Sequence, residues 1–391
     1  GSLRSGVYPF ENSLTSVGTV PTSLRNRKLK WETTEQWNLG LDLGFLDERI
    51  GLTVDWYRKT TRDLLLNTAL PTSSGYFSAM KNVGKVRNQG IEFTLNTTNI
   101  KNRHFSWTTN FNIAFNKNKV LELAENQSSL LSAAKFDQNY NSQYSYIAKV
   151  GYPMGMMYGF IYEGTYKYED FDKVGDTYTL KRNVPYFSSE SNTQPGMPKY
   201  ADLNGDGVYG NDADNEFQGC SNVPKYNFGL QASANWKGFD FSMNWSGAAG
   251  FKIYYYRLAL NSSATIKGYA IGEAIANDHY FFDPKNPNDP RTNLSSKNPR
   301  LTNNSGNDQS GMTQSSVHLQ KGDYIKLKNL TIGYTLPAVL SKKVYAQNIR
   351  FFASGENLFT ITGYEGMDPE MRTAVGYSTM RQYAFGVNIT F

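Results

Sequence analysis

Segments in which apolar and polar residues alternate strictly recur along the chain. The last of them, residues 383–391, carries a large apolar residue at every second position and ends on Phe391. Side chains of a strand point alternately to its two faces, so the pattern predicts a strand with one apolar and one polar face. Such strands are typical of outer-membrane β-barrels, but an edge strand of a soluble β-sandwich shows the same period.

Three pairs of alternating segments are separated by very short polar stretches and predict β-hairpins. The pairs are 37–45 with 50–63, 89–100 with 105–116, and 225–236 with 238–250. Two later segments, 321–335 and 348–360, are less regular. In the first, the apolar phase changes around Lys328 and Asn329, which predicts a β-bulge there, and Pro337 marks the end of the strand.

Short and long connections alternate along the chain. The long links are 64–88, 117–224, 251–320 and 361–380. Outer-membrane barrels have short periplasmic turns and long external loops, and with the turn at 46–49 in the periplasm every strand direction is consistent up to Phe391. The count gives nine strands, or eleven if the stretch 154–162 supplies two more. An odd number cannot close antiparallel, so we expect strands from elsewhere to complete the barrel.

Composition agrees with a barrel and excludes several other classes. Charged residues make up 19% and aromatic residues 14% of 391 residues, yet the mean hydropathy is −0.54, as expected when only alternate residues meet lipid. No run of 18 apolar residues exists, which excludes membrane-spanning helices. The single Cys220 excludes an internal disulfide framework. The net charge of +6 is scattered, and the basic stretch 25–30 lacks aromatic residues, so nucleic-acid binding is not expected.

Six stretches in chain order resemble the SusC/RagA family of TonB-dependent outer-membrane transporters of Bacteroidetes. They are 29–42, 82–92, 200–207, 324–334, 353–358 and the terminal strand. The resemblance implies a bacterial outer-membrane protein with a 22-stranded barrel, of which 29–391 is the C-terminal part. The strand directions place residues 1–28 in an external loop. The expected fold class is therefore all-β, a transmembrane antiparallel barrel portion of 9–11 strands. Residues 1–6 lack the apolar core of a signal peptide, and we expect the beginning of the protein, with the plug and the N-terminal strands, on another chain or segment.

The resemblance also implies a function and partners. Family members import nutrients, mostly oligosaccharides and less often peptides, with a SusD-like surface lipoprotein as a lid and with TonB acting through the missing segment. The expected partners are therefore that lipoprotein, TonB, the N-terminal barrel and plug segment, outer-membrane lipid and an oligosaccharide or peptide. Two alternatives remain open, a passive porin and a secreted carbohydrate-binding or adhesin β-domain without transport.

The segment 202–208 matches the start of a calcium-binding loop. Asp202, Asn204 and Asp206 would supply side-chain oxygens and Val208 its carbonyl. The twelfth position, normally Glu, is Ala213, so Asp214 is the candidate last ligand if the loop holds one extra residue. The alternative is a pair of glycine turns that bind no metal.

No enzymatic site is expected. His104, His279 and His318 are far apart in sequence, and no Ser or Cys lies in a nucleophile motif. No cofactor is expected beyond the candidate structural calcium ion. Aromatic residues of the long links could stack on sugars, hold peptides or simply pack the loops together. They are Tyr140, Tyr144, Tyr146, Tyr254, Tyr255, Tyr256, Tyr280, Phe281 and Phe282.

Overall fold

The computed structural model forms two compact units. Unit 1 comprises Gly1–Asn96, Asn112–Leu130 and Ala148–Met154, and unit 2 comprises Thr97–Phe111, Leu131–Ile147 and Gly155–Phe391. The structure describes residues 3–10, 14–21, 26–69, 74, 76, 78–124, 127–132, 146–175, 177–187, 190–209, 214, 216–255, 270–286, 288–301, 315–371, 377 and 379–391.

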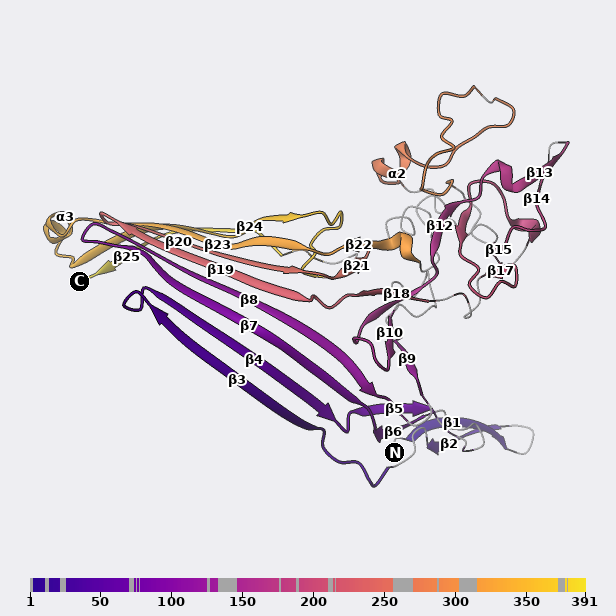
Figure 1. Cartoon of the computed structure of the whole chain (residues 1–391), viewed down its shortest axis with the longest axis horizontal. Helices are drawn as coiled ribbons and strands as arrows, with labels where there is room; N and C mark the ends of the chain where they lie inside the picture. Colours follow the sequence, from indigo (N-terminus) through magenta and orange to yellow (C-terminus); the bar gives the residue numbers. More distant parts are fainter. Residues whose placement is uncertain are drawn as a thin grey trace. The chain divides into compact units, whose positions relative to one another are not determined.

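Nine strands, labelled in Figure 1, form one sheet in the order β25-β24-β23-β20-β19-β8-β7-β4-β3. The sheet is open, with β3 and β25 at its edges, so it is part of a barrel. Its strands are β3 (Thr33–Phe45), β4 (Ile50–Arg62), β7 (Lys85–Lys101), β8 (Phe105–Glu122), β19 (Tyr226–Trp236), β20 (Phe239–Ala249), β23 (Tyr324–Thr335), β24 (Asn348–Thr362) and β25 (Gln382–Thr390).

The prediction of nine strands is confirmed. The stretch 154–162 contributes β11 (Met156–Gly159) and the start of β12 (Tyr162–Thr165), and both lie in other, smaller sheets. β7 and β8 are longer than predicted, because their ends carry Lys and Asn in place of the apolar residues on which the prediction depended.

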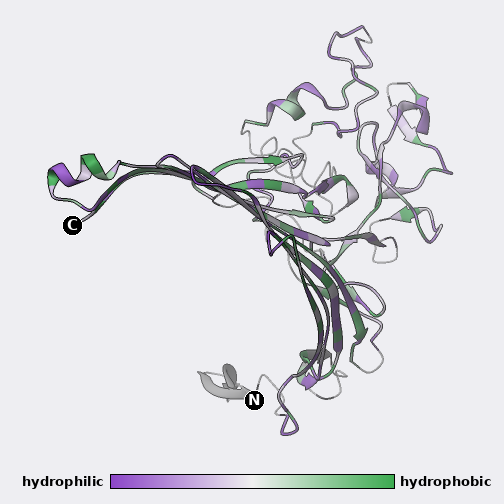
Figure 2. Cartoon of the chain, turned by 60° about the vertical axis from the view of Figure 1, so that its left-hand side comes forward, coloured by the Kyte–Doolittle hydropathy of each residue, from purple (hydrophilic) through white to green (hydrophobic). Residues whose placement is uncertain are grey.

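Strand register places the apolar residues of neighbouring strands in rows on one face. Leu43 pairs with Leu52 and Leu39 with Trp56, whereas Asp42 pairs with Thr53 on the opposite face. In unit 2 the same holds for rows such as Phe239, Tyr334, Phe351 and Val387. Figure 2 shows hydrophobic and hydrophilic residues along the same strands. The apolar side chains stay exposed, with Leu39 71% and Phe385 81% accessible, as expected of a surface that meets lipid.

The predicted bulge is confirmed. In the pairing of β20 with β23, Asn244 faces Asn329 and Trp245 faces Leu327, so Lys328 has no partner. The pairing of β23 with β24 is also irregular between Leu327 and Asn329, and Asn357 of β24 has a φ of 52°. The extra residue restores the phase, because it lets Ile325, Leu327 and Leu330 all face the apolar side.

The short links are tight turns and one helical segment. Between β3 and β4, Leu46, Asp47 and Glu48 all have positive φ, and between β19 and β20 Lys237 and Gly238 do. The link from β23 to β24 contains α3 (Ala338–Ser341) and η6 (Lys342–Val344).

The remaining elements are short and belong to the long links and the first residues. Residues 1–28, predicted as an external loop, include the paired strands β1 and β2; their location outside the membrane stays a prediction. The strands are β1 (Leu3–Phe10), β2 (Leu14–Pro21), β5 (Leu65–Ala69), β6 (Ser78–Asn82), β9 (Ser129–Ser132), β10 (Tyr146–Lys149), β13 (Phe171–Val174), β14 (Thr177–Leu180), β15 (Tyr186–Phe187), β16 (Pro198–Tyr200), β17 (Val208–Tyr209), β18 (Glu216–Ser221), β21 (Lys252–Tyr254) and β22 (Leu319–Lys321). The helices are η2 (Tyr168–Asp170), η3 (Glu190–Asn192), α2 (Glu273–Asn277) and η5 (Ser316–His318). In the part of the chain that is described, no helix has the length and apolar character needed to cross a membrane.

Gly90 of β7 lies on the polar face where a backbone oxygen and a tyrosine side chain approach it closely. A Cβ added there would lie 2.3 Å from the Phe115 carbonyl oxygen and 2.7 Å from the Tyr57 hydroxyl. Tyr57 in turn hydrogen-bonds Asn116 (3.0 Å). The backbone oxygen cannot yield without distorting the strand pairing, so this position requires glycine.

We expect Gly90→Ala to destabilise the assembled protein by about 1–3 kcal/mol, the usual result of overpacking. Gly363→Ala is the matched control, because a Cβ at Gly363 would meet no atom within 4 Å. Thermal unfolding of the complete detergent-solubilised protein would measure both. Equal melting temperatures for the two variants would contradict the close packing at Gly90.

Candidate functional site

The residues of the predicted calcium loop are held by hydrogen bonds within the loop. The two carboxylate oxygens of Asp202 accept from Gly205 N and Gly207 N, each at 2.8 Å. Asn204 Oδ1 accepts from Asp206 N (2.9 Å), and Asp206 Oδ1 accepts from Val208 N (2.8 Å). Gly205 and Gly207 have φ of +74° and +80°, which allows the chain to turn this sharply.

Asp214 joins this loop from further along the chain. Its Oδ1 accepts a hydrogen bond from Leu203 N (3.1 Å), and the residue is fully buried. Among the residues that are described, its Oδ2 has no hydrogen-bond partner. Asp212 and Ala213 lie outside the described residues. In the described part, no three His, Cys, Asp or Glu side chains are arranged as a ready metal site.

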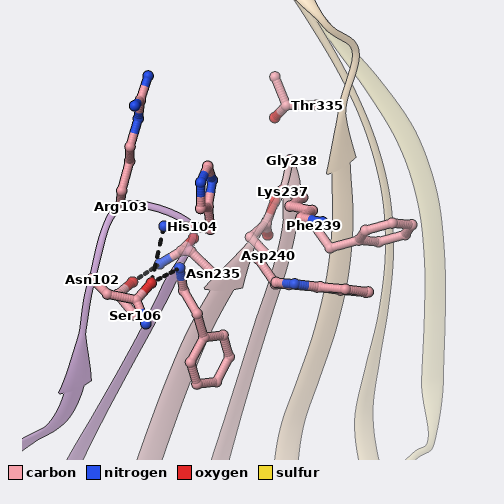
Figure 3. A pocket seen from close by; sticks show the side chains of 12 residues that line it. Asn102, Arg103, His104, Ser106, Asn235, Lys237, Gly238, Phe239, Asp240 and Thr335 are labelled. Atoms are coloured by element: carbon pink, nitrogen blue, oxygen red, sulfur yellow. Dashed lines mark hydrogen bonds between the residues drawn. The ribbon is translucent and has the colours of Figure 1, made fainter.

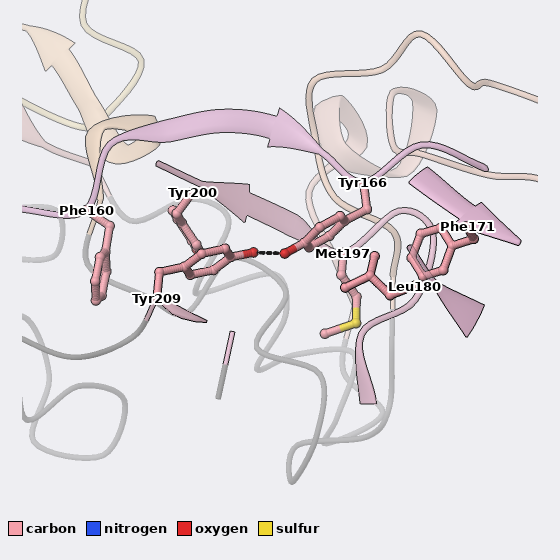
Figure 4. Packing of buried hydrophobic residues seen from close by; sticks show 7 residues of the cluster. All are labelled: Phe160, Tyr166, Phe171, Leu180, Met197, Tyr200 and Tyr209. Carbon is pink, nitrogen blue, oxygen red and sulfur yellow. Dashed lines mark hydrogen bonds between the residues drawn. The ribbon is translucent and has the colours of Figure 1, made fainter. Parts of the chain in front are cut away.

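A cluster of tyrosines forms the core of the link that contains this loop (Figure 4). Tyr166 and Tyr209 share a hydrogen bond between their hydroxyls, and the Tyr166 hydroxyl donates to the Pro185 carbonyl (2.6 Å). Burial raises the pKa of both hydroxyls above the ordinary value. Buried residues of the cluster are Phe160, Tyr166, Phe171, Leu180, Met197, Tyr200 and Tyr209. Tyr209 directly follows Val208, so this core supports the predicted calcium loop, residues 202–208, called the acidic loop below.

Most of the aromatic residues that the sequence indicated as loop candidates pack against other rings. Tyr146 contacts Tyr254 edge-on (5.9 Å between ring centroids), and Tyr168 stacks on Tyr280 (6.4 Å) and meets Phe282 edge-on (4.6 Å). Burial raises the pKa of Tyr280 to about 12. Tyr255 lies against Tyr364, and the Arg291 guanidinium lies over the Phe281 ring. Tyr140, Tyr144 and Tyr256 lie outside the described residues.

An ionic cluster that the sequence reasoning missed ties the link 363–381 to β23. Lys326 is 2% exposed, and its Nζ donates to Asp368 (2.8 Å), Glu370 (3.0 Å) and Thr379. Lys328 Nζ contacts the same Glu370 at 2.5 and 2.6 Å. The i, i+2 spacing of the lysines on a polar strand face was visible, but nothing in the sequence indicated their partners.

The ionic cluster sets the charge state of the two carboxyl groups. Burial by itself would raise the pKa of Asp368, but hydrogen bonds from Lys326 and Thr379 outweigh it and hold that pKa below the ordinary value. The pKa of Glu370 is lowered in the same way, by Lys328 and Lys326 against burial. Both groups are therefore ionised at neutral pH and keep the lysines paired.

At the opposite end of the strands, a hollow of about 380 Å³ lies beside the short turns (Figure 3). Asn102 caps its own turn by accepting from His104 N and Phe105 N, and Lys237 N donates to the His104 carbonyl. Nearby, Asp240 accepts from Arg350 at 2.8 and 2.5 Å across the intervening Gly333. Of the other histidines, His279 hydrogen-bonds the Ile275 carbonyl and His318 is buried.

Comparison with known proteins decides the family. The family model described as TonB dependent receptor-like, β-barrel matches residues 4–358. This chain belongs to the TonB-dependent receptor β-barrel family. The prediction of a SusC/RagA-type outer-membrane barrel is thereby confirmed, and the family consists of transporters and receptors.

Individual relatives cover the chain almost completely. TonB-dependent receptor P3 of Formosa agariphila is 31% identical over 99% of the chain and 37% of its own length. TonB-dependent receptor SusC of Bacteroides thetaiotaomicron is 25% identical over 98% of the chain and 34% of its own length. The solved structure of the RagAB peptide transporter matches all of the chain and 38% of the solved chain with a TM-score of 0.72 at 22% identity, which shows the shared fold. The chain thus spans less than two fifths of these relatives.

We expect Lys326→Met to release the link 363–381, because it leaves the buried Asp368 carboxylate without its main partner. Breaking a buried ion pair on one side typically costs about 3–5 kcal/mol. Hydrogen exchange of residues 363–371 in the intact complex would measure the release. Lys321→Met, at an exposed position, is the control; equal protection in both variants would contradict a structural role for the cluster.

Proposed function

We propose that this chain is the C-terminal part of the barrel of a TonB-dependent importer that takes up an oligosaccharide. The observation that carries the proposal is the open nine-stranded sheet with an exposed apolar face and a polar face. Sheet edges at β3 and β25 would leave backbone groups unpaired in lipid at several kcal/mol each, so strands from the rest of the protein must pair with them. This separates the importer from a secreted carbohydrate-binding or adhesin domain, which would need no membrane-facing surface.

The polar face supports a sugar as the substrate. It carries neutral amides and hydroxyls in hydrogen-bonded pairs, such as Asn118 with Asn88 (2.7 Å) and Tyr57 with Asn116 (3.0 Å). Such groups match the hydroxyls of an uncharged oligosaccharide. A peptide is the alternative substrate, since the RagAB relative is a peptide transporter.

The proposed partners follow from the same arrangement. A SusD-like surface lipoprotein would cover the side of the long links, and TonB would act through a plug segment elsewhere in the protein. A passive porin, the remaining alternative, would carry neither a plug nor a TonB-binding segment.

The substrate class can be tested on the complete complex purified from its native membrane. We expect calorimetric titration to show binding of neutral oligosaccharide mixtures and none of peptide mixtures of similar size. Binding of peptides alone would overturn the sugar assignment but leave the importer intact. Recovery of this chain alone as a folded monomer in detergent-free buffer would contradict the importer itself.

We also propose that the loop 202–214 holds a structural calcium ion. The buried Asp214, with one oxygen that no described donor satisfies, supports the proposal, because a cation would satisfy it. Asp202, Asn204, Asp206, the Val208 carbonyl and Asp214 would be the ligands. Millimolar external calcium would suffice for a weak site of this kind.

We expect calcium to raise the melting temperature of the chelator-treated complex. At a free calcium concentration one hundred times the dissociation constant, binding would stabilise the folded state by up to about 2.7 kcal/mol. Asp214→Asn should abolish the shift, because it removes the buried charge. Asp172→Asn, at an exposed aspartate of β13, should keep it. A shift that persists in Asp214→Asn would place the ion elsewhere.

A further inference from the structure

Basic residues gather on the apolar face of unit 1 at the end of the strands away from the short turns. Along β3 and β4 the paired rows run Phe45 with Ile50, Leu43 with Leu52, Leu41 with Val54 and Leu39 with Trp56. The next rows on the same face are Trp37 with Arg58, Glu35 with Thr60 and Thr33 with Arg62. The apolar band therefore ends in two tryptophans, and arginines follow directly.

Side-chain contacts place basic residues of β7 on this same face. Arg87 Nε donates to Thr60 Oγ1 (3.4 Å), so Arg87 shares the face of Arg58 and Arg62. Lys85 follows by the period of two. The opposite face is fixed independently, because Tyr57 lies under Gly90 and hydrogen-bonds Asn116.

β8 continues the basic surface. Phe115 contacts Phe93 edge-on (6.2 Å) on the apolar side, while Asn118 hydrogen-bonds Asn88 on the polar side. Lys117 and Lys119 alternate with Asn116 and Asn118, so they lie on the apolar side, and both are exposed.

Side chains of β3, β4 and β7 line a hollow of about 410 Å³. Its lining consists of Glu35, Trp37, Trp56, Arg58, Thr60, Arg62, Lys85 and Arg87. Four of these residues are cationic, and Glu35 is the one carboxylate. The Arg62 guanidinium forms an ion pair with Glu35, and the Trp37 indole N–H donates to it (3.0 Å). Arg58, Lys85 and Arg87 therefore leave a net charge of about +3 in the hollow.

We propose that this hollow binds the phosphate groups of an anionic glycolipid in the external leaflet of the outer membrane. The short turns face the periplasm in such barrels, so the hollow lies at the external boundary of the hydrocarbon, where tryptophan belts lie at the level of the headgroups. Mutual repulsion of three cations next to lipid is strong, because the local dielectric is low, and a phosphate relieves it. Guanidinium groups bind phosphate in a bidentate manner, and the tryptophans contact the adjoining acyl chains.

The site differs from the transport pathway, because it faces lipid and the pathway lies on the polar face. The glycolipid would act from outside the barrel, by neutralising the rim of β4, β7 and β8. The proposal rests on the membrane orientation and not on the identity of the transported substrate. It can therefore fail while the importer proposal stands.

The test uses the complete transporter in detergent micelles and native mass spectrometry. The probes are bisphosphorylated lipid A, the same lipid with both phosphates removed, and inorganic phosphate. We expect the bisphosphorylated lipid to remain bound, and the other two to bind at least about tenfold more weakly. Equal binding of the dephosphorylated lipid would overturn the phosphate assignment, and equally tight binding of inorganic phosphate would overturn the assignment to a lipid.

Variants localise the site. Arg58→Gln with Arg87→Gln should weaken lipid A binding by about tenfold or more, since each basic group near the surface contributes to the attraction. Lys59→Gln with Lys81→Gln is the control, because it removes the same number of charges. Lys59 follows Arg58 in the chain but points to the opposite face, and Lys81 does not line the hollow. Arg58→Lys with Arg87→Lys keeps both positive charges and should keep most of the lipid A binding. It shows whether the site tolerates substitution when the charge is retained. Equal affinity in the glutamine and control variants would overturn the proposal.

Discussion

The whole sheet depends on hydrogen bonding between neighbouring strands in a medium that offers the backbone no other partner. Each strand therefore has to meet its neighbour along its full length, and the register of one pair fixes the face of every side chain in the next. The rows from Phe239 through Tyr334 and Phe351 to Val387 show this across four strands. The same constraint makes an open edge intolerable in lipid, which is why β3 and β25 require further strands.

The polar face carries the contacts that hold one of the long links. Lys326 and Lys328 extend from it to Asp368 and Glu370, so a long link is fastened to the inside of the wall. The bulge at Lys328 lets the strand return to its apolar phase after two consecutive polar positions. In the link that contains β11 to β18, the tyrosine core instead holds the acidic loop in place through Tyr209. The links are thus ordered by their own contacts as well as by the wall.

The alternation of residues was sufficient to predict the nine strands, the short turns and the bulge, because each is a local consequence of a period of two. It was not sufficient for contacts between distant segments. The partners of Lys326, the burial of Asp214 and the packing of Tyr280 against Tyr168 depend on how the links fold back, and no local pattern encodes that. The basic residues around the hollow could not be grouped from the sequence for a related reason. Arg58, Arg87 and Lys117 are spread over three strands and become neighbours only through strand pairing.

The most direct test of the membrane-facing sheet is the accessibility of spin labels in the complete protein reconstituted in lipid, with Cys220→Ser as background. Labels at Leu41→Cys and Asp42→Cys sit on adjacent residues of β3 that face opposite sides. We predict that the label at 41 collides mainly with oxygen dissolved in the lipid, and that the label at 42 collides mainly with a water-soluble nickel chelate. Equal exposure of both labels to the nickel chelate would contradict the assignment of the apolar face to lipid.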